Sequence, residues 1–163
     1  MSTRSNIAVD KDDGSIIRVY CHFDGYINEG VGQTLHNYYN DKDKATSLVS
    51  KGDISQLGTD EEHTQFYKDR GFSWGRAHTQ EDWSNIQPIS SADRYSMMNE
   101  MRGNLHIEYL YYFATCEHVP EGQWYVSESK FLDTAEMGID SEHATLHYWT
   151  KFIPLEAFFT EKD

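Results

Sequence analysis

Residues 5–23 read SNIAVDKDDGSIIRVYCHF, and this stretch decides the fold. Ile7 and Val9 alternate with polar neighbours, the turn-forming run DKDDG follows, and Ile17 and Val19 resume the alternation. A period of two residues is typical of a β-strand that buries one face. The stretch therefore predicts a β-hairpin.

The end of this hairpin carries a thiol, an imidazole and a carboxylate within YCHFDGY, residues 20–26. Neighbouring side chains of a strand point to opposite faces, so we expect Cys21 on the buried face and His22 on the other. A nucleophilic pair needs its thiol and imidazole within hydrogen-bond reach, and this pattern therefore favours a non-catalytic strand. The second face gathers the candidate ligand-binding residues, which are Arg18, Tyr20, His22 and Asp24.

Helical spacing follows in three places. Apolar residues three and four apart predict a helix over 31–39 and a second over 41–51, begun by Asn40 or Asp41. Ser90 and Asp93 resemble a capping box and predict a short helix that ends near Met101.

A second hairpin is predicted in the second half of the chain. The aromatic and β-branched runs 107–113 and 124–126 flank a turn that contains Pro120 and Gly122. Residues 129–163 are expected to form a helical C-terminal extension, with a helix from Asp140 or Ser141 to Ile153. The fold class predicted is α+β: one domain, residues 1–163, with an antiparallel sheet built from two β-hairpins and helices packed on it.

Charge restricts the classes of partner. The formal net charge is −13, and 11 of the 27 acidic residues follow position 107. Such a surface repels nucleic acid and membranes and favours basic partners. Acidic residues on a rigid surface can also imitate the phosphates of DNA, so we expect a partner-binding acidic surface in the last third of the chain. Its candidate residues are Glu117, Glu121, Glu128, Asp133, Glu136, Asp140 and Glu142.

Metal and cofactor motifs are weak. His143 and His147 stand four apart, a spacing that can chelate zinc on a helix, but Ala144 occupies the position where a metalloprotease motif has Glu. No third ligand is apparent, so neither a metal nor a cofactor is expected. Cys21 and Cys116 are expected as reduced thiols.

The order of several segments carries a resemblance. STRSNIAV, VYCHFDGY, GVGQTLHNYYND and GDISQLG, with EYLYYF and GQWYV further on, resemble a family of small accessory proteins encoded by bacteriophages and other mobile elements. The resemblance spans roughly residues 2–128. It implies a protein that acts in the cytoplasm of a bacterial host, and it supplies no catalytic residues.

Two functions follow from these observations. The first is a non-enzymatic phage accessory protein that binds and modulates a host protein, in host takeover or against a host defence, by DNA mimicry in one version. The alternative is a small-molecule-binding or hydrolytic protein that uses the face of Arg18, Tyr20, His22 and Asp24. A homodimer that pairs through the aromatic strand at 109–113 is a further possibility.

Overall fold

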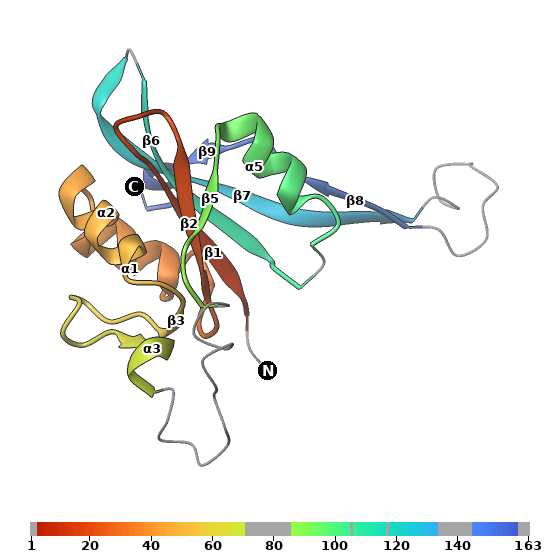
Figure 1. The fold of residues 1–163 in the computed structure, drawn as a ribbon. Helices are drawn as coiled ribbons and strands as arrows, with labels where there is room; N and C mark the ends of the chain where they lie inside the picture. Colours follow the sequence, from red (N-terminus) through yellow and green to blue (C-terminus); the bar gives the residue numbers. More distant parts are fainter. Residues whose placement is uncertain (1–2, 71–85, 105, 117, 134–144, 160–163) are drawn as a thin grey trace.

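The structure, a computed structural model, describes residues 3–70, 86–104, 106–116, 118–133 and 145–159 (Figure 1). Its strands are β1 (Ser5–Asp10), β2 (Ile16–Cys21), β3 (Ile54–Gln56), β4 (Gln65–Phe66), β5 (Ile89–Ser91), β6 (Tyr109–Cys116), β7 (Val119–Asp133), β8 (Thr145–Trp149) and β9 (Ile153–Pro154). Its helices are α1 (Val31–Tyr38), α2 (Lys42–Ser50), α3 (Tyr67–Arg70), α5 (Arg94–Met101) and the 3-10 helix η1 (Leu155–Phe158).

One open, mixed sheet contains all the described strands. Its main order is β4-β3-β2-β1-β6-β7-β8, with β5 paired to β2 and β9 paired to β7. Both predicted hairpins are present, as the antiparallel pairs β1–β2 and β6–β7. The α+β class is confirmed, but the expectation of a purely antiparallel sheet was wrong. The two hairpins are joined by a parallel pairing of β1 with β6, and β2 also pairs with β3 in parallel.

Helices cover both faces of this sheet, so the molecule has three layers. Figure 1 shows α1 and α2 on one side of the sheet and α5 on the other. The first side holds the larger core, in which Leu35 and Leu48 from the helices meet Ile7, Phe113 and Trp124 from the strands. The second side holds a smaller core, in which α5 packs its two buried methionines on the sheet. A sheet covered on both faces explains why Ser5–Val9 are buried at every position.

The predicted helices are confirmed with small changes at their ends. Asp41 is the N-cap of α2 and accepts a hydrogen bond from the Lys44 N–H at 2.8 Å. Asp93 is the N-cap of α5 and accepts from the Ser96 N–H at 2.8 Å. These caps satisfy N–H groups that a helix leaves unpaired at its start. No helix in the described part of the chain combines the length and apolar character needed to cross a bilayer.

The predicted C-terminal helix was wrong where the structure describes it. Residues 145–149, TLHYW, form strand β8 and pair antiparallel with the end of β7. This run is rich in β-branched and aromatic residues, which fit a pleated strand well. The described part of the extension adds β8 and β9 to the sheet and ends in the 3-10 helix η1.

The turn of the second hairpin also differs from its prediction. β6 ends at Cys116 and β7 begins at Val119, so Pro120 and Gly122 lie inside β7 rather than in the turn. Gly122 has a φ of +91° and lies against the ring of Phe113: a Cβ at this position would come within 2.4 Å of that ring. Glycine is therefore required at residue 122 by both the backbone and the packing.

Substitution of Gly122 by Ala should destabilise the protein more than the same change at Gly14. Gly14 has a similar φ of +90° but open space where its Cβ would be. We expect Gly14→Ala to lower the free energy of unfolding by about 1 kcal/mol through backbone strain alone. Gly122→Ala should cost about 1 to 3 kcal/mol more, because the Phe113 ring must move. Urea denaturation of both variants measures the difference, and equal losses would contradict the packing role of Phe113.

Candidate functional site

Arg18 is a structural residue under α5. Only 6% of it is exposed, and its Nη1 donates to Ser91 Oγ at 3.1 Å and to Glu100 Oε1 at 2.7 Å. The hydrogen bond from Arg18 lowers the pKa of the Glu100 carboxyl. The guanidinium thus connects β2 to β5 and α5, and these bonds hold it inside the fold.

Tyr20 and His22 do lie together, as their shared strand face predicts. The Tyr20 hydroxyl and His22 Nδ1 are 2.6 Å apart. Asp24 lies beyond the end of β2, is exposed, and accepts a long hydrogen bond of 3.5 Å from the Gln56 amide. The structure therefore brings together two of the four predicted ligand-binding residues. Of the other two, Arg18 lies under α5 and Asp24 lies beside β3.

Cys21 lies on the other face of β2, in the larger core. Burial raises the pKa of its thiol to about 12, which disfavours the nucleophilic thiolate at neutral pH. Its Sγ is directed to the carbonyl oxygen of Phe23, 3.8 Å away. The side chain is a small apolar core group, and YCHFDGY holds no thiol–imidazole pair.

Asp53 is a neighbour of this cluster that the sequence analysis missed. Its Oδ1 accepts a hydrogen bond from the Tyr20 N–H at 2.9 Å, and burial raises the pKa of its carboxyl to about 7. The residue follows Gly52, where α2 has ended and the chain turns into β3. Nothing in the local sequence distinguishes it from the many exposed acids, because its burial arises from packing against β2.

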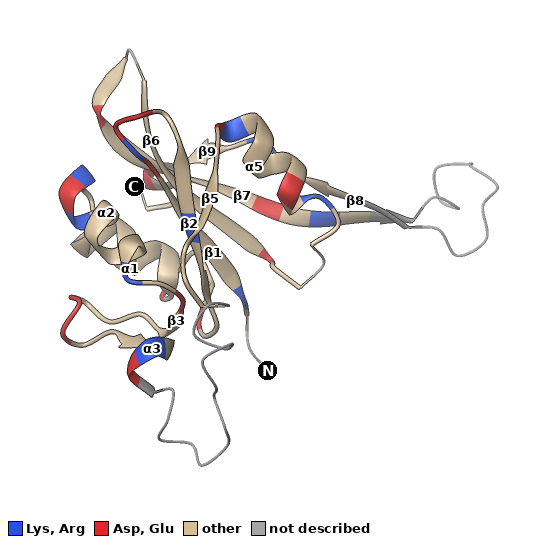
Figure 2. Cartoon of the chain, viewed as in Figure 1, with Lys and Arg blue, Asp and Glu red and all other residues tan. Residues whose placement is uncertain are grey.

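The predicted acidic surface is only partly described. Glu121 is exposed near the start of β7, whereas Glu128 forms an ion pair with Lys130 at 2.8 Å, and Figure 2 shows these opposite charges close together on β7. The two acids are seven positions apart along β7, which is about 23 Å. Asp133 ends β7. Glu117, Glu136, Asp140 and Glu142 lie outside the described residues, so the acidic surface stays a prediction.

His147 anchors β8 to the end of α5. Its Nδ1 accepts a hydrogen bond from the Gly103 N–H at 3.2 Å, and its Nε2 lies 2.7 Å from Ser129 Oγ. Both ring nitrogens therefore have protein partners, and a ring that accepts at Nδ1 donates from Nε2. His143 lies outside the described residues. Among the residues that are described, no group of three potential ligands is placed to hold a metal ion.

The ends of β7 and β8 form a two-stranded ribbon that stands out from the sheet (Figure 1). We call residues 129–133 and 145–149 the β7–β8 ribbon. β6 pairs with β7 only as far as Glu128, so the ribbon has no strand on that side within the described chain. Phe131 is 51% exposed and Tyr148 is 41% exposed. The ribbon therefore presents aromatic rings on a thin, protruding element.

The outer edge of β8 lacks the usual protection of an edge strand. Natural edges carry charged residues or proline, which prevent another strand from pairing with them. The continuation toward β9 has both, in Lys151 and Pro154, but TLHYW in β8 has neither. Among the described strands, β8 ends the sheet order and has no partner beyond it. As far as the described residues show, the edge of β8 is thus open to a further strand.

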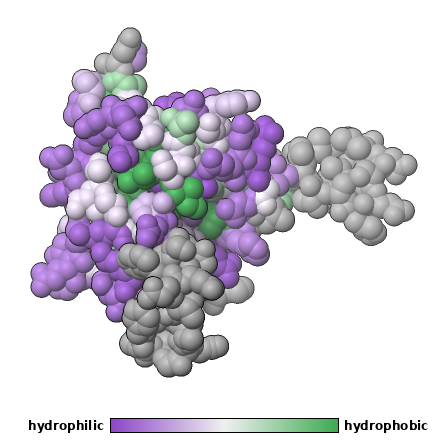
Figure 3. Space-filling view, viewed as in Figure 1, coloured by the Kyte–Doolittle hydropathy of each residue, from purple (hydrophilic) through white to green (hydrophobic). Residues whose placement is uncertain are grey.

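Other exposed apolar side chains lie elsewhere on the molecule. Figure 3 shows apolar side chains at the centre of the visible face, over β2 and β5, surrounded by hydrophilic ones. Ile89 of β5 is exposed there. The aromatic strand expected to form a homodimer is not part of any such surface: β6 lies between β1 and β7, and Tyr111, Tyr112 and Phe113 are buried. Pairing of two chains through this strand was therefore a wrong expectation, and a dimer through another surface stays untested.

Asp53→Asn should stabilise the protein, and more strongly at pH 8 than at pH 5. A carboxyl whose pKa is raised in the folded protein stabilises the fold fully below its ordinary, unfolded-state pKa. For Asp53 this stabilisation is lost as the pH rises through its folded-state pKa of about 7. Asn keeps an acceptor for the Tyr20 N–H and has no charge to desolvate. The gain in the free energy of unfolding of Asp53→Asn over the natural protein should be roughly 2 kcal/mol smaller at pH 5 than at pH 8. Urea denaturation at both pH values measures it, and a gain independent of pH would show that Asp53 has an ordinary pKa.

Among known proteins, the chain matches no family model, no curated protein and no solved structure. The resemblance to accessory proteins of phages and mobile elements therefore stays a prediction.

Proposed function

We propose that this protein is a non-enzymatic accessory protein of a bacteriophage or mobile element, and that it acts by binding a host protein at the edge of β8. The observation that carries the proposal is the open, unprotected β8 edge on a ribbon with exposed Phe131 and Tyr148. An added strand would satisfy the backbone groups of that edge, and the two rings would give specificity.

The ribbon itself favours a partner. A two-stranded element is only marginally stable in water by itself. Here α5 supports one end, because Trp149 Nε1 donates to the Met101 carbonyl at 3.0 Å and His147 accepts from Gly103. Phe131 lies beyond these contacts, and its ring touches only that of His147 among the ring pairs of the described chain, at 5.1 Å. A partner strand would cover this outer part.

The charge of the chain suggests what kind of protein binds. At a net charge of −13, association is fastest with a basic surface. Host proteins that handle nucleic acid, including defence complexes, have such surfaces. Inhibition of such a complex by acidic mimicry of DNA is the finer form of the proposal, and it depends on the acidic residues between 117 and 142.

The described residues favour binding over catalysis. The only thiol within YCHFDGY is buried with a raised pKa, and Arg18 is held by Ser91 and Glu100. The alternative function on the Arg18, Tyr20, His22 and Asp24 face is therefore left with Tyr20 and His22 as its core.

Tyr148→Lys should abolish partner binding and leave the fold intact. The charge blocks strand addition at the edge and removes an aromatic contact. Tyr38→Lys is the matched control, because Tyr38 is similarly exposed, at 49%, but lies at the end of α1. Each tagged protein is used as bait in a bacterial lysate, and the captured proteins are identified by mass spectrometry.

We expect a host protein that the natural chain and Tyr38→Lys retain and Tyr148→Lys loses at least about tenfold. Retention of the same protein by Tyr148→Lys would place its binding surface elsewhere. Light scattering on the purified chain distinguishes a self-association: a dimer that Tyr148→Lys converts to a monomer would show that the β8 edge binds a second copy and not a host protein.

A further inference from the structure

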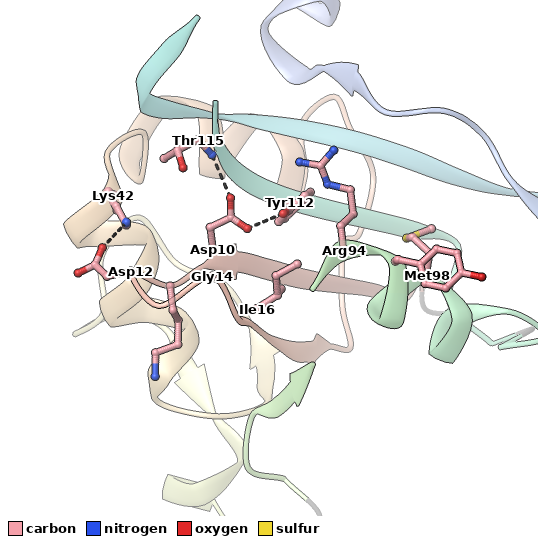
Figure 4. A pocket seen from close by; sticks show the side chains of 11 residues that line it. Asp10, Asp12, Gly14, Ile16, Lys42, Arg94, Met98, Tyr112 and Thr115 are labelled. Atoms are coloured by element: carbon pink, nitrogen blue, oxygen red, sulfur yellow. Dashed lines mark hydrogen bonds and ion pairs between the residues drawn. The ribbon is translucent and has the colours of Figure 1, made fainter. Parts of the chain in front are cut away.

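A hollow of about 760 Å³ lies between the β1–β2 turn, the start of α5 and the end of β6. Its volume is in the range of sites for small organic ligands. The residues used below are Asp10, Lys11, Ile16, Arg94, Tyr95, Met98, Tyr112 and Thr115, and Figure 4 shows most of them.

The floor and one side of the hollow are apolar. Ile16 and Tyr112 are buried residues that present part of their surface to it, and Met98 of α5 is half-buried beside them. Tyr95 stands at the rim with 77% of its surface exposed, the highest value among the large apolar side chains of the described chain. Tyr95 and Met98 are three apart on α5 and so lie on the same side of the helix. Together they offer a platform for a flat ring.

A carboxylate is fixed on the opposite wall. Asp10, at the end of β1, accepts hydrogen bonds from the Tyr112 hydroxyl and, at 3.1 Å, from the Thr115 N–H. Figure 4 shows Asp10 between Thr115 and Tyr112, with Arg94 beyond Tyr112. Each carboxylate oxygen keeps a lone pair, so Asp10 can also accept from a ligand hydroxyl.

Positive charge gathers in the same hollow. Lys42 is neutralised by Asp12 at 2.5 Å. Arg94 and Lys11 form no close ion pair among the described residues, but Asp10 and the Tyr112 hydroxyl interact with Arg94, and Asp13 attracts Lys11. The Arg94 guanidinium lies 5.3 Å from the centre of the Tyr112 ring. One face of a guanidinium and most of its five donors stay available in such a stack. Three cations, Lys11, Lys42 and Arg94, line the hollow against two carboxylates, Asp10 and Asp12. In a chain of net charge −13, this local excess of positive charge favours an anionic ligand.

Arg94 is also placed where a helix disfavours a cation. It is the first residue of α5, whose positive dipole end is at this terminus. The local helix would be more stable with an acidic or neutral residue there. The N-cap carboxylate of Asp93 already offsets part of this positive charge, and an anion bound beside Arg94 would offset more of it.

The geometry points to a binding site for a nucleotide-class ligand, a small phosphate that carries hydroxyls and a flat ring. Arg94 and Lys11 would bind the phosphate, Asp10 would accept from the sugar hydroxyls, and Tyr95 with Met98 would stack on the base. This site lies apart from β8 and does not depend on the proposed partner.

Calorimetric titration with AMP, GMP, CMP and UMP tests the site. We expect at least one of them to bind with a Kd of about 100 μM or lower. Its nucleoside, which lacks the anion, and inorganic phosphate, which lacks the ring, should each bind at least about tenfold more weakly. Arg94→Gln and Tyr95→Ala should each weaken the bound nucleotide by about tenfold or more. Both side chains are exposed, so neither substitution should lower the thermal midpoint.

Arg102→Gln is the matched control, since Arg102 follows the other end of α5, is exposed and does not line the hollow. It should bind the nucleotide as the natural protein does. The proposal is overturned if none of the four nucleotides binds at millimolar concentration, or if Arg94→Gln binds as tightly as Arg102→Gln. Equal affinity for inorganic phosphate would also overturn it, by showing a general anion site, and equal affinity for the nucleoside would exclude a role for the cations.

Discussion

The parallel hydrogen bonding between β1 and β6 joins the two hairpins of this protein into one sheet. Its register places Ser5 opposite Tyr109 and Val9 opposite Phe113, with β1 in the middle of the strand order. A central strand of this kind is buried on both faces, which requires a helical layer on each side. Buried polar groups then need partners across the layers: the Tyr111 hydroxyl donates to the Gly25 carbonyl at 2.6 Å, and Trp124 Nε1 donates to the Tyr39 carbonyl at 3.1 Å. The packing role of Gly122 follows from the same arrangement, because its glycine lets β7 lie close to Phe113.

Local patterns predicted the local elements well. The alternation in residues 5–23 and the caps at Asp41 and Asp93 act over a few residues, and the structure confirms the elements that they predict. The parallel joining of the hairpins left no such signal, since it depends on packing between strands that are far apart in the sequence. The helix expected from Asp140 or Ser141 to Ile153 was wrong over TLHYW, because pairing with β7 makes this run a strand.

The candidate site residues also divide into those that a local pattern predicts and those that depend on packing between distant segments. The strand period correctly separated Cys21 from the Tyr20–His22 face, because that separation is set by the pleat alone. It gave no indication that Arg18 would be covered by α5, or that Asp53 would be buried beside Tyr20. The hollow could not be predicted either. Asp10, Arg94 and Tyr112 come from three distant segments, and each by itself is an ordinary residue of a strand or helix end.

Helix α5 connects the two proposed binding surfaces. Its first residue, Arg94, lines the hollow, and the carbonyl of its last residue, Met101, accepts from Trp149 of β8. Gly103, directly after the helix, donates to His147 of the same strand. Eight helical residues span about 12 Å and move as a rigid body over that length. A displacement at one end is therefore transmitted to the other. The Arg18–Glu100 ion pair, which holds the C-terminal turn of α5 to β2, resists such a displacement. Coupling between the two surfaces would have to act against that ion pair, and by linkage it would be equal in both directions.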